Sequence, residues 1–338
     1  AVRGGLAMVS IGVSLFFAEI SGSAVADVAA LGSIMIPEMK KRGYGAPFAA
    51  AVTSSSASLA IIIPPSIPMI LYAVSANTSV EQLFVAGFIP GLMGAIGLMG
   101  VSWWFARRYN LPVEEAFNWP RLRRAAIEAG PTFLLPVIIL GGIFGGFVTA
   151  TEAAGLAVLA AIGVGIWYRE VDFRQLHRAM LEGGMQTAVV MVLVAASVLM
   201  GGFLTRAQIP QELAAQMVAF TDSKYLILLI LNVFFLVIGF FLHSAAAIIL
   251  VVPIVVPLIQ QVGIDPVHFG LVVTLNLAIG QQTPPVASVL ITACSIARAN
   301  IWEVTRVNLP FIAVLVGVLL ICTYVPAIPM FLVELFYR

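Results

Sequence analysis

The sequence predicts an all-α membrane protein that crosses the bilayer several times and contains two inverted structural repeats. The first observation is a scarcity of charge: the 338 residues include 17 Lys and Arg and 16 Asp and Glu, 10% of the chain, against ~25% in an ordinary globular domain. The second is a mean hydropathy of +1.06. The third is a recurrence of proline and glycine at a spacing of 220 residues. A soluble domain this poor in charge could not cover its surface, so a soluble fold is excluded.

Seven apolar segments are predicted to cross the membrane, because a span needs ~20 mostly apolar residues. In chain order they are residues 46–76, 82–105, 132–148, 153–168, 179–205, 268–297 and 309–333. Two further apolar regions are interrupted near their middles, so each half is short for a full span. Short halves suit re-entrant hairpins, which are tolerated at membrane depth when they pack inside protein. We therefore expect hairpins over residues 6–38 and 225–258.

The basic residues predict the orientation of these segments. If both hairpins return to the side that they entered, 14 of the 17 Lys and Arg fall on the cytoplasmic side, as the positive-inside rule requires. The connector at residues 106–131 is then cytoplasmic, and its charges fit either an interfacial amphipathic helix or a solvated loop. The net charge of +1 gives no concentrated basic surface, so no nucleic-acid partner is expected.

The repeat divides the chain into four parts. Residues 1–105 hold the first copy (hairpin 6–38, broken helix 46–76, span 82–105), residues 106–131 form the connector, residues 132–224 hold intervening spans, and residues 225–338 hold the second copy (hairpin 225–258, broken helix 268–297, span 309–333). The positions in register are Pro37 with Pro257, Gly43 with Gly263, Pro64-Pro65 with Pro284-Pro285, and Pro90 with Pro310. One connector reads Lys40-Lys41-Arg42 and its counterpart Gln260-Gln261-Val262, which predicts opposite sides and hence inverted copies.

Inverted repeats with broken helices are typical of secondary transporters, whereas a channel or a membrane enzyme has less need of that symmetry. The three histidines lack His-Glu-x-x-His spacing and no aspartates are paired within the apolar segments, so the sequence does not predict an enzyme. The ionisable residues near membrane depth are Glu19, Asp27, Glu152 and His243. Asp27 fits ion-site support or helix capping equally, Glu152 fits a helix start, and His243 is either a packed tip residue or a proton-sensitive group.

The two Pro-Pro breaks predict cation sites. Proline has no N–H and cannot bond the carbonyl four residues earlier, which frees the carbonyls of Ala60, Ile61 and Pro64 in one copy and of Gly280 and Gln281 in the other. Na⁺ would satisfy such oxygens, with help from the hydroxyls of Ser54, Ser55, Ser56, Ser66 and Thr283. The half-helix after each break points a positive dipole end toward the midplane, where an anionic carboxylate would be favoured. The alternative is that the prolines only kink packed helices, with water filling the gap.

Several of these stretches resemble the large membrane subunit of tripartite ATP-independent periplasmic (TRAP) transporters, the DctM-like family. They are residues 20–27 (ISGSAVAD), 32–39 (GSIMIPEM), 63–72 (IPPSIPMILY), 149–154 (TATEAA) and 283–286 (TPPV). The resemblance extends over essentially the whole chain, although the N-terminal spans of the family's large subunit are missing. It implies an elevator fold of the ion-transporter superfamily and a Na⁺-driven symporter for organic acids in the bacterial inner membrane. The implied partners are a small membrane subunit, separate or fused, and a periplasmic binding protein that delivers the carboxylate; no cofactor is implied beyond Na⁺ as coupling ion.

The resemblance also implies where the ligands lie. Its first Na⁺ site comprises Ser21, Gly22, Ser23, Ser56, Ala60, Pro64, Pro65 and Ser66. Its second comprises His243, Gly280, Gln282, Thr283 and Pro284, and the substrate pocket between them comprises Ser54, Ser55, Ser66 and Thr283. The family commonly has an acidic residue where this chain has His243. A stand-alone Na⁺/dicarboxylate symporter of the same architecture is the alternative function.

Overall fold

The computed structural model describes residues 3–111, 118–221 and 223–337, and every regular element within these ranges is a helix. Within the described ranges, seven helices are long and apolar enough to cross a membrane by length and composition. They are Val80–Arg108, Trp119–Phe144, Ala150–Trp167, Phe173–Leu204, Lys224–Phe241, Ser244–Gln261 and Ile301–Tyr324. The prediction of an all-α, multi-pass membrane protein is confirmed.

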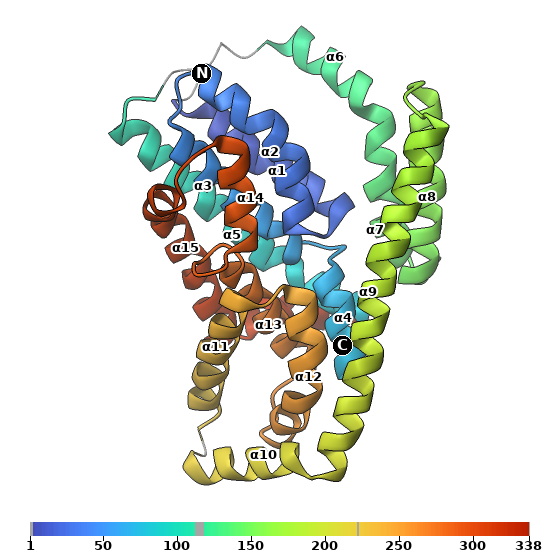
Figure 1. Ribbon diagram of the computed structural model, residues 1–338, viewed down its shortest axis with the longest axis vertical. Coiled ribbons are helices and arrows are strands. Elements are labelled where there is room, and N and C mark those ends of the chain that lie inside the picture. The colour runs from blue at the N-terminus through green and yellow to red at the C-terminus, as the bar shows by residue number, and fades with distance from the viewer. Residues whose placement is uncertain (1–2, 112–117, 222, 338) are drawn as a thin grey trace. The chain divides into compact units, whose positions relative to one another are not determined.

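The chain forms two compact units, the first built from residues 1–115 and 203–338. Its N-terminal helices are α1 (Gly5–Ser21), α2 (Ala24–Lys41), α3 (Ala46–Ala57), the 3₁₀ helix η1 (Ser58–Ile61), α4 (Ile67–Ala76) and α5 (Val80–Arg108). Its C-terminal helices are α10 (Ile209–Phe220), α11 (Lys224–Phe241), α12 (Ser244–Gln261), α13 (Pro266–Gly280), α14 (Ser288–Ala297), α15 (Ile301–Tyr324) and α16 (Ala327–Tyr337). Figure 1 shows α11 and α12 between α10 and the region around α13.

The second unit comprises residues 116–202. It contains α6 (Trp119–Ala129), the 3₁₀ helix η2 (Gly130–Phe133), α7 (Leu134–Phe144), α8 (Ala150–Trp167) and most of α9 (Phe173–Arg206). Thr149 and Glu152 form a capping box at the start of α8, as the helix-start assignment of Glu152 predicted. Residues 112–117 of the predicted connector lie outside the described residues, and α6 supplies the amphipathic part with Arg121, Arg123 and Arg124 exposed.

The core of the first unit is made by the two helices that precede the proline breaks. In α3 every residue from Phe48 to Ala57 is buried, and in α13 every residue from Val267 to Gly280 is buried. Helix α1 packs on α3 and α11 packs on α13, while α2 packs on α14 and α12 packs on α4. The two helices that lead into the breaks, α3 and α13, are therefore enclosed by their neighbours.

Two element boundaries differ from the prediction. The predicted span 309–333 is divided, since α15 ends at Tyr324 and α16 begins at Ala327. The physical reason is Pro326, which disfavours the helical conformation at the preceding residue; Val325 accordingly has φ −123° and ψ 73°. The hairpin arms α11 and α12 have 18 residues each, more than expected, and both are long and apolar enough to cross. The non-spanning course of the hairpins stays a prediction.

Candidate functional site

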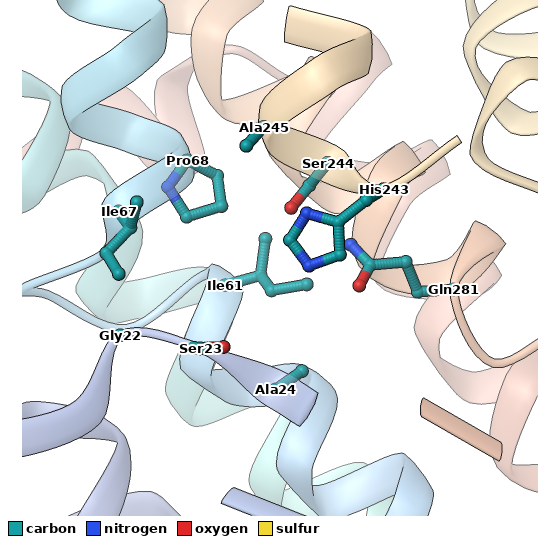
Figure 2. Close-up of a pocket in the computed structure, with 10 residues that line it drawn as sticks. All are labelled: Gly22, Ser23, Ala24, Ile61, Ile67, Pro68, His243, Ser244, Ala245 and Gln281. Atoms are coloured by element: carbon teal, nitrogen blue, oxygen red, sulfur yellow. The ribbon is translucent and has the colours of Figure 1, made fainter. Parts of the chain in front are cut away.

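Four interruptions of helices meet at one small pocket in the first unit. Its lining comes from the α1–α2 tip, the break between α3 and α4, the α11–α12 tip and the break between α13 and α14 (Figure 2). The lining residues are Gly22, Ser23, Ala24, Ile61, Ile67, Pro68, His243, Ser244, Ala245 and Gln281. The pocket has a volume of about 30 Å³, and one water needs ~10–15 Å³ on this measure. It has room for an ion or one or two waters.

The first tip touches the first break directly, as the predicted first Na⁺ site requires. Gly22 ends α1 with φ 60°, and its carbonyl accepts a hydrogen bond from the Ile67 N–H at 3.4 Å. A Cβ at Gly22 would lie 2.8 Å from the Pro65 carbonyl oxygen. The backbone of the tip therefore lies in contact with the backbone of the break, which only glycine allows at this conformation.

A buried carboxylate supports this tip from behind. The Ser21 hydroxyl donates to the Asp27 carboxylate, and the Ser23 N–H donates to the Ser21 hydroxyl oxygen at 3.2 Å. Asp27 is 1% exposed, and its Oδ2 has no hydrogen-bond partner among the described residues. No side chain caps α2. The capping role predicted for Asp27 is therefore not seen, and its role in supporting an ion site stays a prediction.

Three of the five carbonyls that the prolines were predicted to free have partners in this structure. The Ser66 hydroxyl donates to the Ile61 carbonyl at 2.7 Å and also caps α4 by accepting from the Met69 N–H. The carbonyls of Gly280 and Gln281 accept from the N–H groups of Thr283 at 3.0 Å and Val289 at 3.1 Å. The reason is that the chain turns back on itself after each break, so nearby donors replace the missing helical ones.

The serines of α3 are buried but do not line the pocket. The Ser56 hydroxyl lies 2.9 Å from that of Ser14, and the Ser54 hydroxyl donates to the Ala51 carbonyl. The Ser55 hydroxyl donates to Asn308 Oδ1 at 2.5 Å. Their assignment as substrate or Na⁺ ligands stays a prediction, as do the roles of Ala60 and Pro64.

The second tip and second break are joined in the same way as the first pair. The Val286 N–H donates to the Phe240 carbonyl at 3.3 Å. A Cβ at Gly280 would lie 2.5 Å from the Gly239 carbonyl carbon, so α11 and α13 meet backbone to backbone. His243 precedes α12 and lines the pocket, whereas the Thr283 hydroxyl donates to the Ile279 carbonyl. Of the predicted second-site residues, only His243 reaches the pocket.

The structure adds the side chains of three polar residues that the site prediction did not include. Asn308 of α15 donates from Nδ2 to Gln282 Oε1 at 3.2 Å and accepts from the Ser55 hydroxyl at Oδ1. It therefore links the second break to α3. Asn276 donates to Asn232 Oδ1 at 2.7 Å and stands 220 positions after Ser56, so the repeat spacing could have found it. Gln281 lines the pocket and follows the second glycine of the broken helix, but nothing in the sequence separates it from Gln282.

We expect the link from Ser55 to Gln282 through Asn308 to hold α3, α15 and the second break together. Replacing Asn308 by leucine leaves a buried hydroxyl and a buried amide without partners, at ~1–3 kcal/mol each. A double-mutant cycle with Ser55→Ala measures the coupling from melting temperatures in detergent, and we expect the two changes to be clearly non-additive. Strict additivity would contradict the link.

The pocket is surrounded by the starts of three helices. Helix α2 begins at Ala24, directly after Ser23. Helix α4 begins with Ile67 and Pro68, and α12 begins with Ser244 and Ala245. The first turn of a helix has N–H groups without intrahelical partners and carries a partial positive charge. None of the described residues that line the pocket is a Lys or an Arg. The arrangement can hold an anion by helix ends and neutral donors, with a cation held by nearby backbone oxygens.

Comparison with known proteins agrees with this geometry. The profile of the family "Tripartite ATP-independent periplasmic transporter, DctM component" matches residues 1–328. The chain is 42% identical over 98% of its length to the isethionate TRAP transporter permease protein DctMQ of Oleidesulfovibrio alaskensis, of which it covers 52%. It is 37% identical over 97% of its length to the C4-dicarboxylate TRAP transporter large permease protein DctM of Pseudomonas aeruginosa, of which it covers 77%.

A third relative is the sialic acid TRAP transporter large permease protein SiaM of Vibrio cholerae, which is 36% identical over 99% of this chain and is covered to 79%. The chain thus spans about half the length of the DctMQ protein and about three quarters of the other two. These relatives are transporter components, so the prediction that the chain is not an enzyme is confirmed. The chain belongs to the DctM family, the large permease component of tripartite ATP-independent periplasmic transporters.

Proposed function

We propose that the chain imports an organic acid together with Na⁺ by an elevator mechanism. The observation that carries the proposal is that both tips and both breaks meet at one pocket, which is surrounded by helix starts. None of the described residues that line this pocket is a Lys or an Arg. Broken helices near the midplane are where secondary transporters bind ions and substrate. Helix starts suit the acid group, and backbone oxygens suit Na⁺.

The packing of the first unit supports inverted repeats over residues 1–105 and 225–338. A shift of 220 residues relates α1 to α11, α2 to α12, α3 to α13, α4 to α14 and α5 to α15. The same shift converts the α1–α3 contact into the α11–α13 contact, and the α2–α14 contact into the α12–α4 contact. An elevator would move the tips and breaks across the membrane as one body, because each second hairpin helix packs on the broken helix of the other copy.

The two Na⁺ sites would lie at the two contacts between tip and break. At the first, Gly22, Pro65 and Ser66 already lie together, and Asp27 Oδ2, which has no partner among the described residues, adds an oxygen behind Ser21. At the second, Gly280 lies against Gly239 of the tip helix α11. The first site has the more complete oxygen set, so we assign it the larger part of the Na⁺ dependence.

The proposed setting is the bacterial inner membrane. By analogy with its relatives, the chain would work with a small membrane subunit, separate or fused, and a periplasmic binding protein that delivers the acid. Isethionate, C4-dicarboxylates and sialic acid in the names of the relatives define the class of acids to try first. Helices α8 and α9 expose apolar side chains such as Leu159, Val192 and Leu199, as lipid contact would require.

Reconstituted uptake tests this function. We expect liposomes with the membrane subunits to accumulate a labelled acid only with an inward Na⁺ gradient and the binding protein. Ser23→Ala should weaken the Na⁺ dependence several-fold, and Pro65→Ala should do so as well, whereas Ser33→Ala on an exposed turn of the same helix α2 should not. Uptake that ignores the Na⁺ gradient would overturn the proposal. Uptake without the binding protein would favour the stand-alone symporter.

A further inference from the structure

We propose that Gln281 is a specificity-determining residue that selects hydroxy acids over acids that lack the hydroxyl. The inference rests on the proposed function and adds the chemical class of the substrate. It begins from the one residue in the described pocket lining whose side-chain amide is wholly unsatisfied. Gln281 is 2% exposed, and neither its Nε2 nor its Oε1 has a hydrogen-bond partner among the described residues.

The neighbouring glutamine shows that this lack of hydrogen-bond partners is specific to Gln281. Gln282 is also buried, yet its Oε1 accepts from Asn308 and only its Nε2 is left over. Gln281 has no such partner, although it lines the pocket. A buried donor and a buried acceptor that stay unpaired both oppose folding. A side chain retained in that state at the edge of a pocket is suited to pair with a ligand.

The position of the amide favours a ligand held at two points. Figure 2 places the Gln281 amide beside the His243 ring, on the side of the pocket away from Ile67 and Pro68. The starts of α2 and α12 border the same pocket through Ala24 and Ser244. In this structure the pocket has room for an ion or one or two waters, so an acid would enter only once the tips and breaks move apart. An acid group at the helix starts would then leave another part of the molecule facing Gln281.

The chemistry of the amide identifies that part. A primary amide offers donors at nitrogen and an acceptor at oxygen, whereas an ionised carboxylate or sulfonate is an acceptor only. An acid group at Gln281 could accept from Nε2 but would leave Oε1 unpaired and facing negative charge. A hydroxyl can donate to Oε1 while it or the nearby acid oxygen accepts from Nε2. The hydroxy acid satisfies both ends of the amide, whereas its deoxy analogue leaves at least Oε1 buried and unpaired.

The test compares acids that differ by one hydroxyl. Uptake of 2-hydroxyethanesulfonate against ethanesulfonate, and of malate against succinate, is measured as competition in the reconstituted system. The variant Gln281→Met keeps an unbranched side chain of similar length without the amide. Gln260→Met, at the exposed end of α12, is the matched control. A site that hydrogen-bonds a hydroxyl rejects the analogue that lacks it, so we expect a preference of tenfold or more in the wild type and in Gln260→Met.

In Gln281→Met the preference should fall to about one, with uptake of the deoxy acid retained as evidence that the variant folds. An unchanged preference in Gln281→Met would overturn the inference, and so would a wild type that takes both members of each pair equally well. In both cases Na⁺-driven uptake would still stand. If none of the acids is taken up under a Na⁺ gradient, the proposed function fails with it. If Gln281→Met does not fold, Gln281→Glu, which removes the donor at this position, takes its place. A preference for the hydroxy acid that is the same in the wild type and in Gln281→Glu would overturn the role of Gln281.

Discussion

Gly22→Ala is expected to abolish Na⁺-dependent uptake while the protein still inserts. Gly22 has φ 60°, a left-handed conformation that costs a residue with a Cβ ~1–2 kcal/mol. The added methyl would also lie 2.8 Å from the Pro65 carbonyl oxygen and 3.2 Å from the Ile67 nitrogen. Both are backbone atoms, so no rotamer change can relieve the contact. The tip has to move away from the break, which removes the proposed first Na⁺ site and the hydrogen bond from Ile67 to Gly22.

The matched control separates backbone strain from contact. Gly43 has φ 84°, and a Cβ there meets nothing within 4 Å. Gly43→Ala therefore bears the same kind of conformational cost without the collision. Initial uptake rates at several Na⁺ concentrations, together with melting temperatures in detergent, compare the two variants. If both lose Na⁺ dependence equally, strain alone explains the effect and the contact of tip with break does not matter.

Much of the fold could be predicted from the sequence because the residues that start and end its helices act locally. Proline pairs mark the two breaks, and Ser66, Ser79 and Asp265 each cap the helix that follows, as residues of these types commonly do. The division of the last predicted span was also visible in principle, since Pro326 follows Val325. The span was nevertheless predicted as one helix, because the apolar run continues past Pro326 without a charged residue until Glu334.

The site could be predicted only in part, because its contacts join residues far apart in sequence. The contact of Gly22 with Pro65 was expected from the resemblance to a family, and the structure brings those residues together. The hydrogen bond of Ser66 with the Ile61 carbonyl could not be predicted in this way. The absence of an N–H in proline shows which helical hydrogen bonds are lost, but it does not show which other donors replace them. The link from Asn308 to Ser55 spans 253 positions, and no periodicity in an apolar helix reports which polar residue meets which.

Gly280→Ala is expected to destabilise the protein strongly. Its Cβ would lie 2.5 Å from the Gly239 carbonyl carbon and 2.6 Å from the Gly239 Cα, so α11 and α13 would have to separate at the point where the second tip meets the second break. Overpacking of a tight core costs ~1–3 kcal/mol, and a contact between two backbones relaxes less than one between side chains. We expect a lower melting temperature in detergent and loss of coupled uptake.

The reciprocal position supplies a graded comparison. A Cβ at Gly239 would lie 3.1 Å from the Gly280 Cα, so Gly239→Ala should be milder, because a small shift of α11 relieves it. Gly317→Ala lies in α15 where a Cβ meets nothing within 4 Å, and there alanine should raise stability by about 1 kcal/mol through its higher helix propensity. The expected order of melting temperatures is Gly317→Ala, then Gly239→Ala, then Gly280→Ala. A Gly280→Ala variant as stable as Gly317→Ala would show that α11 and α13 are not held together at these glycines, and the second Na⁺ site would have to be sought away from this contact.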